Sequence, residues 1–99
     1  MKDKISMPLI EAMLQYKSED IYPLHTPGHK GGRGMQRLLR QELGASVQMD
    51  VSLMSELDDI HEPETYIKEA QELAAQTYGS DACFWAVNGT SQAIHAMLL

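Results

Sequence analysis

One segment of this chain, residues 82–87, has a clear buried-strand pattern, and it limits what the chain can fold into. The run is short, aliphatic and aromatic, and Asn88 and Gly89 turn the chain directly after it. One strand cannot form a sheet, because its backbone and apolar faces need neighbouring strands. The order of helix, strand, turn and helix nevertheless indicates α/β layering. We therefore expect the mostly helical opening part of an α/β domain.

Helices are predicted wherever apolar residues recur at the helical period. Ser6 is a candidate N-cap for the first helix, and Gly44 and Gly79 are candidate ends for the next two. The predicted helices cover residues 6–17, 35–43, 63–78 (beginning at Pro63) and 90–99. The last one stops in the middle of its apolar pattern, so we expect a truncated domain. Residues 22–34 and 45–64 are predicted loops, the second with a short strand near 47–53.

Composition is that of a soluble globular protein. Hydrophobic residues make up 43% and charged residues 22% of the 99 residues, and the net charge of −6 at pH 7 opposes binding to nucleic acid or an anionic membrane. The only cysteine, Cys83, cannot form an internal disulfide, and we expect it to be buried with Phe84 and Trp85. No stretch suits a signal peptide or a membrane span, so we expect a cytoplasmic protein.

The turn Asn88-Gly89-Thr90-Ser91 is the first candidate site. The opening amides of a helix lack intrahelical acceptors and lie at the positive end of its dipole, so they can hold a phosphate. Gly89 would let the anion approach closely, and the hydroxyls of Thr90 and Ser91 could add hydrogen bonds. By pattern alone, an ordinary Asn-Gly turn with a capping hydroxyl is the more frequent outcome.

The loop at residues 25–32 is the second candidate site. It gathers His25, His29 and Lys30 among prolines and glycines. Two imidazoles, an ammonium group and exposed amides suit a carboxylate or phosphate ligand. A basic surface loop without a ligand explains the same composition equally well, so both interpretations stay open.

An acidic segment, residues 56–64, is the third candidate site. Its carboxylates and His61 could hold a metal ion, but their spacing matches neither an EF-hand nor a zinc site. Charged runs of this kind are usually solvated or cap a following helix, and Glu62 and Glu64 flank the predicted helix start at Pro63. We therefore predict no metal site.

Three blocks of the sequence are distinctive in their order along the chain. They are PLHTPGHKGG (23–32); LDDIH (57–61) with Pro63, IKEAQ (67–71) and YGS (78–80); and FWAVNGTS (84–91). Together they resemble the major domain of the Orn/Lys/Arg decarboxylases, over nearly the whole chain after the first predicted helix. Two local departures are residues 64–66, where the family often has a Gly-Pro pair, and residues 92–96.

The resemblance implies fold type I, the aspartate-aminotransferase-like α/β architecture, with pyridoxal 5′-phosphate (PLP) as cofactor. Residues 1–34 would be an amino-terminal helix and loop, and residues 35–99 the start of the PLP-binding major domain. The cofactor-binding residues that it implies are Gly89, Thr90, Ser91 and, through its amide, Gln92. The residues that it implies near the active site, often at a subunit boundary, are His25, His29 and Lys30.

The resemblance also implies the activity of the complete enzyme, a homo-oligomer that decarboxylates ornithine, lysine or arginine. The family's Schiff-base lysine lies further along its chain, so we expect none of the lysines here to fill that role and predict that the 99-residue chain alone is inactive. Those lysines are Lys2, Lys4, Lys17, Lys30 and Lys68. Two alternatives stay open: a nonenzymatic truncated module that binds a partner, and another fold type I enzyme such as an aminotransferase.

Overall fold

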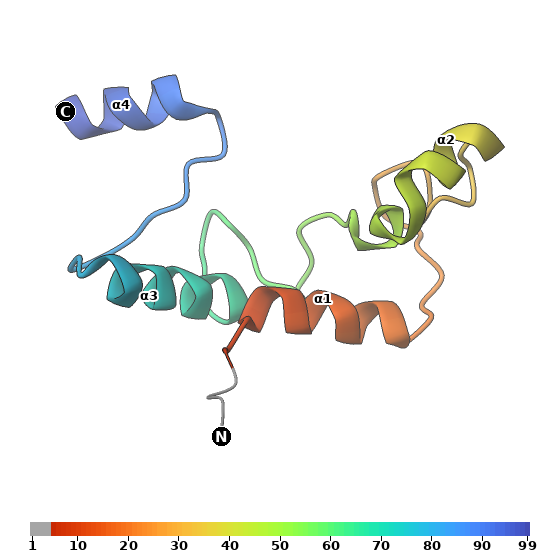
Figure 1. Cartoon of the computed structure of the whole chain (residues 1–99), viewed down its shortest axis with the longest axis horizontal. Helices are drawn as coiled ribbons and strands as arrows, with labels where there is room; N and C mark the ends of the chain where they lie inside the picture. The colour runs from red at the N-terminus through yellow and green to blue at the C-terminus, as the bar shows by residue number, and fades with distance from the viewer. Residues whose placement is uncertain (1–4) are drawn as a thin grey trace.

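The computed structural model describes residues 5–99, and the regular elements of this part of the chain are helices (Figure 1). In chain order they are α1 (Pro8–Ser18), α2 (Arg37–Leu43), the 3-10 helix η1 (Gly44–Met49), α3 (Tyr66–Tyr78) and α4 (Thr90–Leu98). Between residues 5 and 99 the only β pairing is an isolated antiparallel bridge from Met54 to Asp58. The prediction of a mostly helical chain is confirmed.

All four predicted helices form, but three of them start later than predicted. Helix α1 starts at Pro8 with Met7 as its N-cap residue, so Ser6 is not the cap. Helix α2 starts at Arg37, and α3 starts at Tyr66 instead of Pro63. The helix ends are closer to prediction, because Gly44 and Gly79 follow α2 and α3 with φ values of 62° and 67°.

The predicted strand at residues 82–87 is wrong for this chain, because the segment has no regular secondary structure. No other segment between residues 5 and 99 offers it a strand partner. The predicted burial of its side chains is also wrong, since Phe84 is 86% exposed, Trp85 is 38% exposed and Cys83 is partly exposed. The short strand predicted near 47–53 is replaced by the end of η1 and an irregular segment.

The core is small and lies mainly where α1 contacts α3 (Figure 1). Its buried apolar residues there are Ala12 from α1, Ile67 and Ala75 from α3, and Leu57 from the preceding loop. A second contact joins α2 and α1 to η1, where Val47 is buried. The two contacts hold the loop at residues 25–34 and the acidic segment in place.

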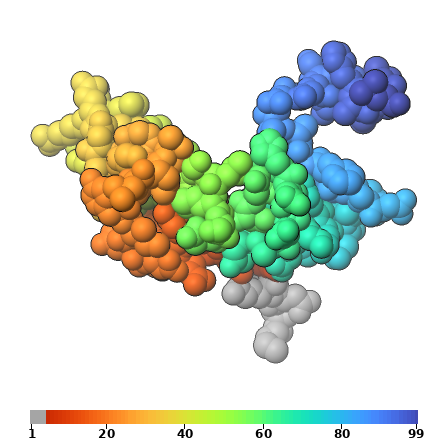
Figure 2. Space-filling model, turned by 180° about the vertical axis from the view of Figure 1, so that it is seen from behind, coloured from red at the N-terminus to blue at the C-terminus, as the bar shows by residue number. Residues whose placement is uncertain are grey.

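The chain is more extended than a compact domain of its size. Its radius of gyration is 16.3 Å, against about 13 Å for a compact chain of 100 residues. Helix α4 contributes most clearly to this shape, because it contacts no other described helix and projects from the body in Figure 2. None of the described helices is long and apolar enough to cross a lipid bilayer.

Candidate functional site

The start of α4 forms an open turn at the position of the first candidate site. Gly89 is the N-cap residue with φ 88° and ψ 169°, a conformation that residues with side chains rarely adopt. A Cβ atom built at Gly89 would have no neighbour within 4 Å, so the space in front of the helix is open.

Backbone donors are available at this turn. The first backbone hydrogen bond of α4 runs from the Ala93 amide to the Gly89 carbonyl at 3.2 Å. The preceding amides, those of Thr90, Ser91 and Gln92, lie in the first helical turn and have no intrahelical acceptor. Gly89 has no side chain that could cap them. The chain thus presents three adjacent N–H donors at the positive end of a helix dipole.

The second candidate site, residues 25–32, lies in a loop that extends to residue 34 and is held by hydrogen bonds of its polar groups. His25 Nδ1 donates to the Thr26 carbonyl, and its Nε2 forms a hydrogen bond with the Tyr16 hydroxyl at 3.0 Å. Lys30 Nζ donates to the His25 carbonyl at 2.6 Å, and the Thr26–Pro27 peptide bond is cis. The Lys30 ammonium group therefore supports the loop from within.

His29 ties the same loop to the segment that follows η1. Its Nδ1 accepts from the Gly32 amide at 3.3 Å, which leaves the proton on Nε2, and Nε2 lies 2.9 Å from Asp50 Oδ2. Gly32 is buried, and a Cβ atom there would lie 3.1 Å from Val47 Cγ1 at a φ of 93°. Both contacts require this loop to lie closely against η1.

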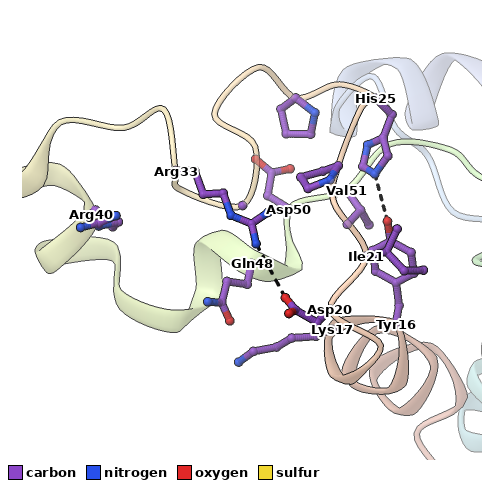
Figure 3. Close-up of a pocket in the computed structure, with 13 residues that line it drawn as sticks. Tyr16, Lys17, Asp20, Ile21, His25, Arg33, Arg40, Gln48, Asp50 and Val51 are labelled. Atoms are coloured by element: carbon purple, nitrogen blue, oxygen red, sulfur yellow. Dashed lines mark hydrogen bonds and ion pairs between the residues drawn. The ribbon is translucent and has the colours of Figure 1, made fainter.

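A pocket of about 360 Å³ lies beside this loop, and we name it the α1–loop pocket (Figure 3). Its lining comes from the end of α1, the loop, α2 and η1 with the residues that follow it: Tyr16, Lys17, Asp20, Ile21, Pro23, His25, Pro27, Gly31, Arg33, Arg40, Gln48, Asp50 and Val51. Of the three loop residues singled out in the sequence, only His25 lines the pocket. His29 instead contacts Asp50, which follows η1, and Lys30 donates to the His25 carbonyl within the loop.

Arg33 has a defined position at this pocket. Its Nη2 lies 3.7 Å from Asp20 Oδ1, and its guanidinium carbon lies 5.0 Å from the centre of the Tyr22 ring. Figure 3 shows Arg33 and Lys17 reaching from different elements toward the space beside Asp20 and Gln48. The ion pair and the aromatic contact restrict the orientation of the guanidinium group.

The acidic segment caps α3, as one of its two predicted roles requires. The carboxylate that does so is that of Asp58, and not those of Glu62 or Glu64. Its oxygens accept from the amides of Asp59, Glu64, Thr65 and Ile67 at 2.9–3.0 Å. Asp58 is only 8% exposed, and burial by itself would raise the pKa of its carboxyl group. The amide hydrogen bonds outweigh burial and lower that pKa from 3.8 to about 2.

Several residues of these sites were not predicted from the sequence. Tyr16 and Asp50 hold the two histidines, and Lys17, Arg33 and Arg40 bring positive charge to the pocket. None of them lies in the conspicuous loop motif. In the sequence only their residue type points to a site. They come close together only because α1 and η1 pack near the loop, and the sequence pattern does not predict that packing.

Comparison with known protein families shows which family this chain belongs to. The profile described as "Orn/Lys/Arg decarboxylase, major domain" matches residues 7–99, which is nearly the whole chain. The chain belongs to the Orn/Lys/Arg decarboxylase family. The family resemblance of the three sequence blocks is therefore confirmed. No solved structure matches the chain.

Curated proteins similar to this chain include arginine and lysine decarboxylases. An arginine decarboxylase of Bacillus subtilis is 40% identical to this chain over 93 residues. The aligned region covers 93% of this chain and 19% of the length of that enzyme. An arginine decarboxylase of Bacillus cereus is 39% identical, and the aligned region covers 93% of this chain and 20% of the length of that enzyme. A lysine decarboxylase of Hafnia alvei is 32% identical over 98 residues, and the aligned region covers 92% of this chain and 13% of the length of that enzyme. The chain spans about a fifth of the arginine decarboxylases that it matches.

Proposed function

We propose that this chain provides the amino-terminal part of a PLP-dependent decarboxylase that acts on a basic amino acid. The observation that carries the proposal is the family match over residues 7–99. The names of the relatives favour arginine or lysine as the substrate. In this proposal the complete domain has fold type I, and the enzyme is a cytoplasmic homo-oligomer.

The start of α4 suits the phosphate group of PLP. The amides of Thr90, Ser91 and Gln92 supply three adjacent donors, and the open space at Gly89 admits an anion. The hydroxyls of Thr90 and Ser91 are in the same turn and can add hydrogen bonds. Phosphate oxygens accept such bonds strongly, because the acceptor is charged. We therefore assign the phosphate to these residues.

Bound PLP would supply an electron sink for the loss of carbon dioxide. What this chain contributes is binding and position. The α4 amides would fix one end of the cofactor, and the loop at residues 25–34 would form a preorganised part of the active-site wall. Tyr16 of α1 holds His25 of that loop, and Asp50 after η1 holds His29, so both imidazole rings keep one orientation.

The test is an assay of the full reading frame that contains this sequence. We expect PLP-dependent release of carbon dioxide from arginine, lysine or ornithine, measured by trapping labelled carbon dioxide from carboxyl-labelled substrate. Transfer of the amino group to a keto acid, without release of carbon dioxide, would instead assign another fold type I activity such as that of an aminotransferase. A reading frame that ends at Leu99 and shows neither activity would favour the nonenzymatic partner-binding module.

A further inference from the structure

The α1–loop pocket has the chemistry of a second anion site, separate from the α4 turn. We propose that it binds a small polyanion, such as a diphosphate or a tricarboxylate. Three cationic side chains line it, those of Lys17, Arg33 and Arg40. They come from α1, the loop and α2, so only the folded chain brings them together. The proposal does not depend on the proposed decarboxylase activity.

The balance of charge in the pocket favours an anion. The two carboxylates in its lining are engaged, Asp20 with Arg33 at 3.7 Å and Asp50 with His29 at 2.9 Å. Lys17 and Arg40 have no ion-pair partner among residues 5–99. The pocket therefore holds more positive than negative charge, although the whole chain has a net charge of −6. An anion with several charges would compensate the unpaired groups.

The walls of the pocket are arranged before any ligand binds. The contacts of Arg33 with Asp20 and Tyr22 orient its planar guanidinium group, and other N–H groups of that fork stay available. The bond from Tyr16 to His25 closes one side of the pocket, and Gln48 adds an amide beside Lys17 and Arg33 (Figure 3). Preorganised donors reduce the entropy that binding loses.

The volume limits the ligand to a small one. Ligand pockets typically span about 300–1,000 Å³, and this pocket, at about 360 Å³, lies at the lower end. Diphosphate and citrate fit that description, because both are compact and carry several anionic oxygens. Their carboxylate and phosphoryl oxygens also match the bidentate geometry of arginine.

The experiment is a titration of the 99-residue chain, labelled with ¹⁵N, with sodium diphosphate and separately with sodium citrate at pH 7. Amide shifts should saturate at Arg33, Gln48 and Val51. Replacing Lys17 by Met or Arg40 by Gln should weaken that binding about tenfold, as expected for the loss of one charge-assisted contact. The arm that saturates at lower concentration identifies the phosphate or the carboxylate class.

Matched controls separate this site from general attraction to cations. Arg37 is in the same helix as Arg40 and Lys68 is in α3, and neither lines the pocket. Arg37→Gln and Lys68→Met should bind both probes as the unchanged chain does. Circular dichroism must show that all variants keep their helix content. The proposal is overturned if neither anion gives saturable shifts at the pocket, or if Arg37→Gln weakens binding as much as Arg40→Gln.

Phosphate binding at the α4 turn cannot be mistaken for binding at this pocket. Its shifts would appear at Thr90, Ser91 and Gln92 and would respond to Gly89→Val, whereas pocket shifts would not. Diphosphate shifts confined to the α4 turn would overturn the pocket proposal and leave the cofactor assignment intact. Diphosphate shifts at the pocket, without shifts at the α4 turn, would support the pocket proposal.

Discussion

Asp58 is the residue that fixes where α3 begins. Four backbone amides from residues 59–67 donate to its two carboxylate oxygens, and two of those donors are Thr65, the N-cap residue, and Ile67 in the first turn. Asp58 has a positive φ of 84°, which Asp and Asn tolerate better than most residues. A single carboxylate thus organises both the loop and the helix start.

The pKa of Asp58 makes the stability of the chain depend on pH. Because the folded pKa is about 2, below the usual 3.8, this carboxylate stabilises the fold above pH 4 and loses its effect as the pH falls through 2. We expect Asp58→Asn to lower the free energy of unfolding by about 1 kcal/mol near neutral pH, as for the loss of a helix cap. Asn is the suitable replacement, because it also accepts a positive φ.

Urea denaturation from pH 7 to pH 2 measures this effect. The unchanged chain should lose stability between pH 4 and pH 2, and Asp58→Asn should lose less over the same range. Asp59→Asn is the control, because among residues 5–99 the carboxylate of Asp59 accepts only from the nearby His61 amide. Parallel pH profiles for the unchanged chain and Asp58→Asn would contradict the assigned role.

At the scale of the elements, local signals predicted the ends of α2 and α3 but not the start of α3. Gly44 and Gly79 mark those ends by sequence, since glycine is favoured at positive φ after a helix. The start depends on Asp58, seven residues before Thr65, and no capping spacing covers that distance. Likewise, His25 and His29 were predicted as site residues, but their partners Tyr16 and Asp50 come from other elements.

The predicted strand failed for a related reason. Residues 82–87 have the composition of a buried strand, but a strand forms only against neighbours, and residues 5–99 provide none. The start of α4 was predicted correctly because an Asn-Gly turn before a helical pattern acts locally. Features that depend on neighbouring residues, such as the start of α4, were therefore predicted correctly, whereas the strand, which needs partners far away in the sequence, was not.

The contact between α1 and α3 should carry most of the stability of the helices. Ile67 is buried in it, so Ile67→Ala should lower the free energy of unfolding by about 2–4 kcal/mol through lost burial and a cavity. Leu38 in α2 is 63% exposed, and Leu38→Ala should cost well under 1 kcal/mol. Thermal unfolding followed by circular dichroism compares the two. Similar losses of stability in both variants would show that this contact is not the core.

The whole molecule exposes more apolar surface than a closed domain would. Trp85 is 38% exposed, Leu98 is 80% exposed, and α4 contacts no other described helix. Apolar surface of this extent favours association. We expect the 99-residue chain to self-associate at micromolar concentration, and Trp85→Ser with Leu98→Ser to weaken that association at least tenfold. Analytical ultracentrifugation tests this, with Leu38→Ser as a control, and a monomer at all micromolar concentrations would contradict it.

The chain by itself should neither decarboxylate nor hold PLP covalently. It spans about a fifth of its arginine decarboxylase relatives, and the one lysine in the candidate loop, Lys30, donates to the His25 carbonyl. Incubation with PLP, reduction with borohydride and peptide mapping should give no stoichiometric adduct on any lysine. Stoichiometric labelling at Lys30 would show that this loop, and not a lysine elsewhere, carries the cofactor.

The central claim is that the α4 turn holds the PLP phosphate, and PLP dissociation constants of the full reading frame test it most directly. Ser91→Ala keeps every amide, so PLP affinity should fall about tenfold, or roughly 1.4 kcal/mol. Gly89→Val should weaken PLP more, because φ is 88° there and a β-branched side chain would obstruct the anion. Lys30→Ala should lower turnover more than affinity. Loss of PLP binding in Lys30→Ala, with unchanged binding in Gly89→Val, would contradict the account.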